Sequence, residues 1–316
     1  MKSKQKSVGK GALLLLLLLL LSGCSGWNER PFVAMEELAT RMTVVDQILQ
    51  QQRDLIKSDD LQRIASQPRL LRNLQLEFPD EEEEWGSPYS YRFYGEGAEE
   101  EPLFLKIERL RLGLRGLNQG LVGYLNGLSQ LASGALIDSS DFAALGHSLN
   151  RGMYTLAGIS GSHAVTPGQI DLFSTLVGQL GEGYVSNKRR DYLQQVVSEN
   201  HPELQRIADH VRAGVRLVAD QVRADYSLRR REVMQAMSAG GIDRAHVAEL
   251  MYQLSAHVAA TLDLLAEIDN GYSQLARTHA QLGGYLRGAP LSTAPLEASV
   301  ARLEQLQQQY SYRQKF

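Results

Sequence analysis

The sequence has a single cysteine and, after its first 23 residues, no long apolar run of the kind that spans a membrane. A single cysteine in 316 residues excludes a disulfide scaffold within the chain. The only long unbroken apolar run lies inside the first 23 residues, and aromatic residues make up only 7% of the chain. Apolar residues nevertheless amount to 43%, against 22% charged, so one or two domains can bury a sizeable core. Collagenous and low-complexity classes are excluded.

The chain also lacks the short motifs of common enzyme and metal sites. It contains no HExxH, CxxC, Walker lysine loop, GxGxxG or GxSxG pattern. Its seven histidines form no i, i+4 pair and no Glu-x-x-His pair, the usual spacings of metal ligands on a helix. From these absences we predict a protein that is not an enzyme and holds no cofactor or metal.

The N-terminal segment has the organisation of a secretory signal. Four lysines precede Ala12 and the leucine run 13–21, and the small residues Ser22 and Gly23 follow. The apolar run is about half the length of a helix that spans a bilayer, which needs about 20 residues. We therefore predict that residues 1–23 are a signal peptide and that the protein is exported.

Leu21-Ser22-Gly23-Cys24 resembles the lipobox of bacterial lipoproteins, and Cys24 is the only cysteine in the chain. The resemblance implies cleavage before Cys24, diacylation of its sulfur and a tether over residues 24–31. Two or more acyl chains hold a protein stably on a bilayer, whereas one chain binds reversibly. The alternative is an incidental thiol beside an ordinary cleavage site. Lipidation also leaves no thiol for nucleophilic catalysis.

The resemblance and the charge balance together predict location and partners. Ser25 in place of aspartate implies the outer membrane rather than the inner one, with the mature chain in the periplasm. Removal of residues 1–23 takes away four of the 33 basic residues and none of the 36 acidic ones, which changes the formal net charge from −3 to −7. A nucleic-acid partner is not expected, because phosphate binding needs a basic face.

The mature chain has the apolar periodicity of helices. The spacing predicts a first helix over 31–57, with Ser58, Asp59 and Asp60 capping a short second helix. Further helices are expected over about 140–156 and 170–196. Pro202 is expected to start a new helix that extends to about 237, and a last helix covers 296–310.

Residues 79–102 interrupt this pattern with prolines, two acidic clusters and aromatic rings. Tyr89, Tyr91 and Phe93 alternate, which places three rings on one side of an extended strand. Together with Trp85 they form a candidate docking element for a protein partner. The alternative is that the rings pack onto the bundle while the acidic side chains are simply solvated.

Glycines recur at spacings of three and four in the next helical segment: Gly113, Gly116, Gly120, Gly123 and Gly127. Each glycine inside a helix makes the helix about 1 kcal/mol less stable than alanine would. A row of five glycines on one face, the glycine stripe, is therefore expected to have a structural role that offsets this loss. We predict close helix packing along the stripe in a tight internal hairpin. The alternative is a membrane-active segment over 113–134, although Arg109, Arg111 and Arg115 make it a poor membrane span.

The clearest periodicity is a heptad seam of twelve positions between Val247 and Leu286. A helix of this length measures about 60 Å, and we predict that the 202–237 helix packs antiparallel to it through a turn at Gly240 and Gly241. His279 lies on the seam and is the histidine expected to be buried and to titrate unusually.

We therefore predict an all-α fold, an elongated antiparallel helical bundle with long coiled-coil-like helices and one acidic, aromatic loop. Its parts are the signal peptide, the tether, N-terminal helices and loop over 32–102, and the bundle over 103–316. The predicted function is a non-enzymatic envelope lipoprotein that acts as a scaffold for an envelope protein partner. Alternatives are a ligand- or cell-wall-binding bundle, including an enzyme of unfamiliar motif, or the membrane-active protein. A second copy of the chain is a further possible partner of the seam.

Overall fold

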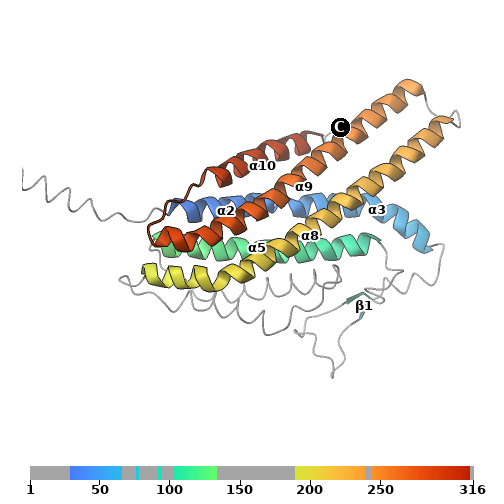
Figure 1. The fold of residues 1–316 in the computed structure, drawn as a ribbon. Helices are drawn as coiled ribbons and strands as arrows, with labels where there is room; N and C mark the ends of the chain where they lie inside the picture. The colour runs from blue at the N-terminus through green and yellow to red at the C-terminus, as the bar shows by residue number, and fades with distance from the viewer. Residues whose placement is uncertain are drawn as a thin grey trace, which may run out of the picture.

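The computed structural model describes residues 29–65, 76–77, 92–93, 103–133, 189–238 and 243–313 (Figure 1). The helices are α2 (Arg30–Met42), α3 (Val45–Ala65), α5 (Leu103–Ser133), α8 (Arg189–Ser238), α9 (Arg244–Leu286) and α10 (Ala294–Arg313). Two short strands, β1 (Leu76–Glu77) and β2 (Arg92–Phe93), pair antiparallel with Leu76 opposite Phe93. The predicted all-α helical bundle is confirmed.

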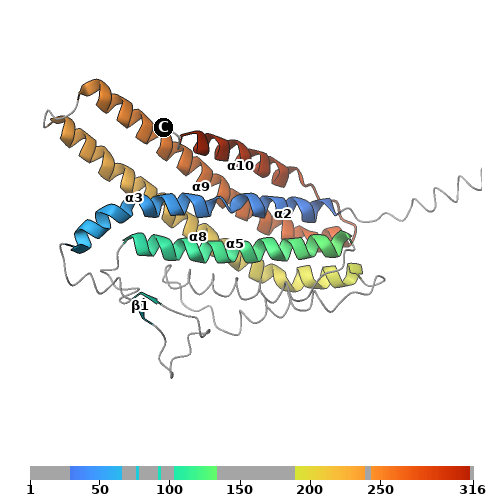
Figure 2. The same ribbon diagram turned by 180° about the vertical axis from the view of Figure 1, so that it is seen from behind.

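Most of the packed helices run in opposite directions, the main exception being α10 against α2 (Figures 1 and 2). α2, α3 and α8 run one way along the molecule, and α5 and α9 run the other way (Figures 1 and 2). α2 packs against α5 and α9, and α8 packs against the same two helices. α5 and α9 therefore lie at opposite corners of this four-helix arrangement, with α2 and α8 between them. α10 lies along α9 and α2 and covers the outside of that pair.

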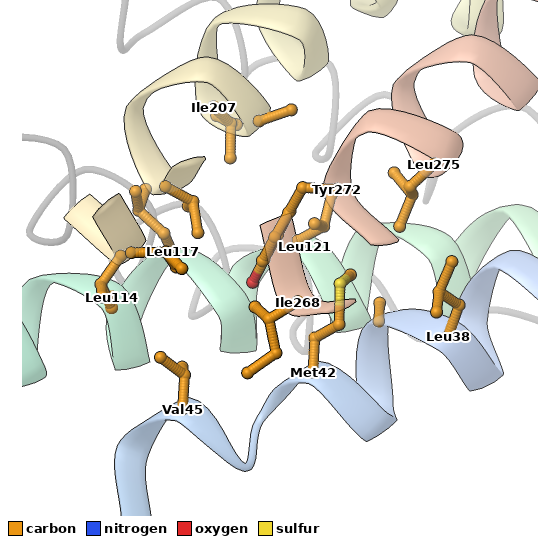
Figure 3. Packing of buried hydrophobic residues seen from close by; sticks show 14 of the residues in the cluster. Leu38, Met42, Val45, Leu114, Leu117, Leu121, Ile207, Ile268, Tyr272 and Leu275 are labelled. Atoms are coloured by element: carbon orange, nitrogen blue, oxygen red, sulfur yellow. The ribbon is translucent and has the colours of Figure 1, made fainter. Parts of the chain in front are cut away.

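One continuous apolar core holds these helices together. Met42 from α2, Leu117 and Leu121 from α5 and Tyr272 from α9 point into the same interior (Figure 3). Each of these side chains is at most 1% exposed. Full burial of such side chains contributes about 1.5–3 kcal/mol each, and the helical spacing of three and four delivers them to one face.

The N-terminal helices differ from the sequence prediction at two points. The single helix expected over 31–57 is broken between Met42 and Val45, where the Thr43 hydroxyl donates to the Thr40 carbonyl at 2.7 Å. A hydroxyl that competes for a helix carbonyl, followed by β-branched residues, disfavours an uninterrupted helix. The caps expected at Ser58, Asp59 and Asp60 are wrong, because α3 continues through them to Ala65.

The expected restart at Pro202 is also wrong, since α8 continues through the proline from Arg189 to Ser238. An interior proline costs about 3 kcal/mol, because its nitrogen has no proton and its ring crowds the preceding turn. Buried side chains on both sides offset this cost, with Val197 2% exposed before the proline and Leu204 0% exposed after it. Tertiary packing therefore outweighs the local break signal.

The predicted antiparallel pairing of α8 and α9 is confirmed, and the pair is longer than the rest of the body. α8 has 50 residues and α9 has 43, whereas α5 has 31. At 1.5 Å per residue, α9 exceeds α5 by about 18 Å. The free end of the hairpin accordingly projects beyond the other helices (Figures 1 and 2).

A half-buried ion-pair network joins α3 to α5. Arg111 donates to Glu108 at 2.6 Å and to Asp46 at 2.8 Å, and Arg53 donates to Glu108 at 2.8 Å. Hydrogen bonds from Arg111 hold the pKa of Glu108 below its ordinary value. These ion pairs fix how α3 and α5 are aligned with each other at the edge of the core.

Two glycines lie where a neighbouring helix leaves little room for a side chain. A Cβ atom on Gly271 of α9 would lie 2.6 Å from the Met42 sulfur of α2. One on Gly214 of α8 would lie 3.2 Å from side-chain atoms of Leu110 and Leu114 on α5. A side chain at either position would therefore require a neighbouring side chain to shift, by more at Gly271 than at Gly214.

Substitution of Gly271 by alanine tests this close approach. We expect Gly271→Ala to lower the free energy of unfolding by about 1 kcal/mol, because overpacking costs about 1–3 kcal/mol and outweighs the gain in helix propensity of roughly 1 kcal/mol. Gly283→Ala is the control, since its Cβ meets only Arg287 Nη1 at 3.8 Å, and it should stabilise. Urea unfolding followed by circular dichroism measures both; equal stabilisation would contradict the close contact.

Candidate functional site

A cluster of polar side chains lies in the middle of the apolar core, on the three helices α5, α8 and α9. Its members are Asn118, Tyr124, Asn200, His201, Tyr272 and His279. All but His201 are at most 1% exposed. A buried polar group without a hydrogen bond costs about 1–3 kcal/mol. The hydrogen bonds within such a cluster therefore strongly constrain how its helices pack.

The larger part of the cluster is a row of hydrogen bonds across the body. The Tyr124 hydroxyl of α5 lies 2.9 Å from Nε2 of His279 on α9. Nδ1 of the same ring lies 3.4 Å from Nδ1 of His201 on α8. The row therefore leads from the fully buried phenol to a half-buried imidazole, and it ties three helices together.

A second layer lies two turns earlier on α9. The Tyr272 hydroxyl donates to Asn118 Oδ1 at 2.7 Å. Asn118 Nδ2 and Asn200 Oδ1 have no hydrogen-bond partner within the part of the chain that the structure describes. Each layer contains a hydrogen bond between α5 and α9. These two hydrogen bonds fix the position of α5 relative to α9 along their axes.

Burial favours the uncharged forms of His279, Tyr124 and Tyr272 near neutral pH. Desolvation, with a smaller contribution from His201, lowers the pKa of His279 to about 3. Desolvation also raises the pKa of Tyr124 and of Tyr272 above the ordinary tyrosine value. These three side chains therefore make their hydrogen bonds as neutral groups. In the described ranges, no group of three or more His, Cys, Asp or Glu side chains is placed to hold a metal ion.

The projecting end of the α8–α9 hairpin is a second candidate site. A hollow of about 580 Å³ lies along its α8 face and is lined by Ser227, Arg230, Arg231, Met234, Gln235 and Ser238. Nearby, Leu228 is 45% exposed and Tyr252 is 69% exposed. This end of the molecule thus combines basic and apolar side chains on an open surface.

The residues singled out in the sequence fall mainly elsewhere. Cys24, Trp85, Tyr89 and Tyr91 lie outside the described residues, and Phe93 belongs to β2. The lipid anchor and the docking loop therefore remain predictions.

The glycine stripe lies on α5, one uninterrupted helix in which Gly113, Gly120 and Gly127 are buried and Gly116 and Gly123 are half-buried. Close contacts with a neighbouring helix are seen at Gly214 of α8 and Gly271 of α9. Close packing along the stripe therefore remains a prediction. Among the described helices, none combines the length and the apolar character that crossing a bilayer requires.

The burial of His279 and its altered titration confirm the expectation from the heptad seam. Sequence reasoning did not identify Asn118, Tyr124 or Asn200. A signal was present, because Asn118 lies four residues after Leu114 and three before Leu121, and Asn200 lies four residues from both Val196 and Leu204. A polar residue at a core-facing step of a helix is the pattern that identifies such positions.

Comparison of the chain with protein-family models, with curated proteins and with solved structures finds no match.

The buried imidazole predicts a specific pH dependence of stability. In the unfolded chain His279 takes up a proton near pH 6.5, whereas in the folded chain it does so only near pH 3. The unfolded state therefore binds more protons between these values, and stability falls as the pH is lowered from about 6.5 towards 3. The steepest contribution of one such group is about 1.4 kcal/mol per pH unit.

We expect His279→Gln to flatten the stability profile between pH 7.5 and pH 5, measured by urea unfolding at each pH. The exposed His246 supplies the control, because His246→Gln should leave the slope unchanged. The slope is the readout, since the substitution also lowers stability at all pH values. An unchanged slope in His279→Gln would show that the buried ring does not titrate in this way.

Proposed function

We propose that the protein is a lipid-anchored envelope lipoprotein that acts as a non-enzymatic helical scaffold and binds a protein partner through the projecting end of its α8–α9 hairpin. This end comprises residues 223–238 of α8 and 244–258 of α9, and we call it the hairpin tip. The observation that carries the proposal is the incomplete burial of the apolar seam at the tip.

The heptad seam continues beyond the part of α9 that the body surrounds. Leu264, Ile268 and Tyr272 are fully buried, whereas Met251 and Leu254 are only half-buried. A seam of this kind is stabilised by a surface that covers it, because each apolar side chain gains about 25 cal/mol per Å² removed from water. The hairpin tip therefore has the character of one half of an interface.

The charge of the tip indicates the chemistry of the partner. Arg229 pairs with Asp225 at 2.9 Å, but Arg230 and Arg231 form no ion pair within the described residues and line the hollow beside Met234. Met234 is 42% exposed, and methionine adapts its shape to varied apolar surfaces. A partner that presents carboxylates around an apolar side chain complements this face.

The placement of the tip fits a membrane-anchored protein. α2 begins at Arg30, close to the start of α10, where Arg30 pairs with Glu297 at 2.7 Å. This end of the body lies opposite the hairpin tip (Figures 1 and 2). The 43 residues of α9 span about 65 Å. An anchor at Cys24 therefore allows the tip to reach tens of ångströms away from the bilayer.

The anchor is tested by removal of the predicted acylation site. We expect Cys24→Ala to abolish labelling with a palmitate analogue and to move the protein from the membrane pellet to the soluble fraction, because no acyl chain remains to partition into lipid. Ser25→Ala, beside it, should keep both properties. An unlabelled wild-type chain, or one that pellets equally well without Cys24, would contradict the lipoprotein proposal.

The docking surface is tested by site-specific photo-crosslinking in intact cells. A photoreactive residue at position 234, in the hairpin tip, should give a discrete adduct. The same residue at the exposed position 308 of α10 should give none. Arg230→Glu with Arg231→Glu should weaken the adduct at least about tenfold, because like charges then face each other across the interface.

Arg302→Glu is the matched charge reversal on α10 and should leave the adduct intact. Equal adducts from positions 234 and 308, or full retention after the tip reversal, would show that the hairpin tip is not the docking surface.

A further inference from the structure

A second hollow, of about 440 Å³, lies on the outer face of α2. The residues of α2 that line it follow one another at helical spacing and include Val33, Glu36, Glu37 and Thr40. We call this surface the α2 hollow, and Glu36 and Glu37 its acidic pair. Val33 is 44% exposed, and Glu37 and Thr40 are also exposed. The α2 hollow therefore presents an aliphatic side chain and two carboxylates on an open surface.

The acidic pair has no ion-pair partner among the described residues. Glu36 accepts a hydrogen bond from Ser129 of α5, which is a neutral donor. Arg41 also lines the α2 hollow, but it pairs with Glu304 of α10 at 2.5 Å. The surface thus complements a protein face that carries uncompensated positive charge.

The hollow at the hairpin tip has the same construction with the opposite charge. Arg230 and Arg231, which we call the basic pair, are exposed beside Met234, which is 42% exposed. Arg231 donates to the Ser227 carbonyl of its own helix at 3.3 Å, and neither arginine forms an ion pair in the part of the chain that the structure describes. The two hollows of one molecule therefore carry complementary charges, each beside an exposed apolar side chain.

The order of residues along the two helices fits one alignment. In α2 the apolar Val33 comes three residues before the acidic pair, whereas in α8 the apolar Met234 comes three residues after the basic pair. When helices with these reversed orders run antiparallel, the two charged pairs lie opposite each other and Val33 lies opposite Met234. The same alignment brings the hydroxyl of Thr40 opposite that of Ser227. A parallel alignment that joins the charged pairs places Met234 opposite Thr40 instead.

We propose that the hairpin tip of one copy of the chain docks antiparallel on the α2 hollow of a second copy. The inference rests on the proposed function, because it names the partner that the hairpin tip binds. Within one copy α2 and α8 run in the same direction, and the tip lies at the end opposite the start of α2 (Figures 1 and 2). The second copy is therefore turned end for end. Two copies in this arrangement can make the contact twice about a two-fold axis.

The axial positions of the two surfaces allow both contacts at the same overlap. Residues 33–40 lie within about 15 Å of the start of α2, and residues 227–234 lie about 60 Å from the start of α8. In an antiparallel pair, the tip of each copy reaches the start of the other copy. Each copy keeps its own anchor at that end, because the six residues from Cys24 to Arg30 span at most about 20 Å.

Photo-crosslinking from the tip identifies the partner. In cells that express the full chain with a photoreactive residue at position 234, the adduct should have twice the mass of the mature chain. Mass spectrometry of the digested adduct should join position 234 to the segment 33–40. An adduct with a different protein would overturn this inference and leave the hairpin tip as a docking surface. Absence of any adduct from position 234 would overturn both.

Charge reversal tests the alignment of the charged pairs. In the tip, Arg230→Glu with Arg231→Glu should reduce the doubled adduct at least about tenfold, because like charges then face each other. In the α2 hollow, Glu36→Arg with Glu37→Arg should do the same. Asp263→Arg reverses an exposed charge of α9 outside both surfaces and should leave the adduct unchanged.

Co-expression of the two reversed chains should restore the adduct when the photoreactive residue is in the chain with the reversed tip, because an acidic tip then meets a basic hollow. Misfolded chains would not regain the contact in this way. Full retention of the doubled adduct after either reversal, or no recovery on co-expression of folded variants, would contradict the proposed contact. The digest of the wild-type adduct decides the contact even if a reversed chain does not fold.

Discussion

The antiparallel packing of α8 against α9 is the interaction on which the rest of the structure depends. Their seam is the longest continuous apolar contact in the described chain, and α5 and α2 complete a body around only part of it. A helix of 31 residues cannot cover a partner of 43 or 50 residues along its whole length. Helix length therefore divides the hairpin into a buried section that builds the core and a projecting section, the hairpin tip, which we propose as the docking surface.

The polar cluster lies in the buried section, where hydrogen bonds have the largest structural consequence. Apolar side chains tolerate small axial shifts between helices, because dispersion and the hydrophobic effect have little directionality. Hydrogen bonds such as Tyr272 to Asn118 at 2.7 Å do not, since a buried polar group that loses its partner costs about 1–3 kcal/mol. The cluster thus specifies the register of α5 against α9, and its histidines connect that register to the solvent side of α8.

Much of the fold could be predicted from the sequence, whereas most of the site could not. The seam from Val247 to Leu286 and its antiparallel partner follow from a regular period and a short connection. The break at Thr43 and the continuity through Pro202 were missed, because both result from a contest between local preference and tertiary burial. His279 was recognised because it interrupts an apolar seam, but its partners are 155 and 78 residues away in the chain.

The sequence by itself determined that the chain is helical, which faces of the helices are apolar and that the two longest helices form a pair, because these properties repeat every three or four residues. Only the tertiary structure decided that Tyr124, His201 and His279 meet and that the hairpin extends past the body. Those outcomes depend on the order of the helices around the bundle and on their axial offsets. Neither quantity is recorded in any local period of the sequence.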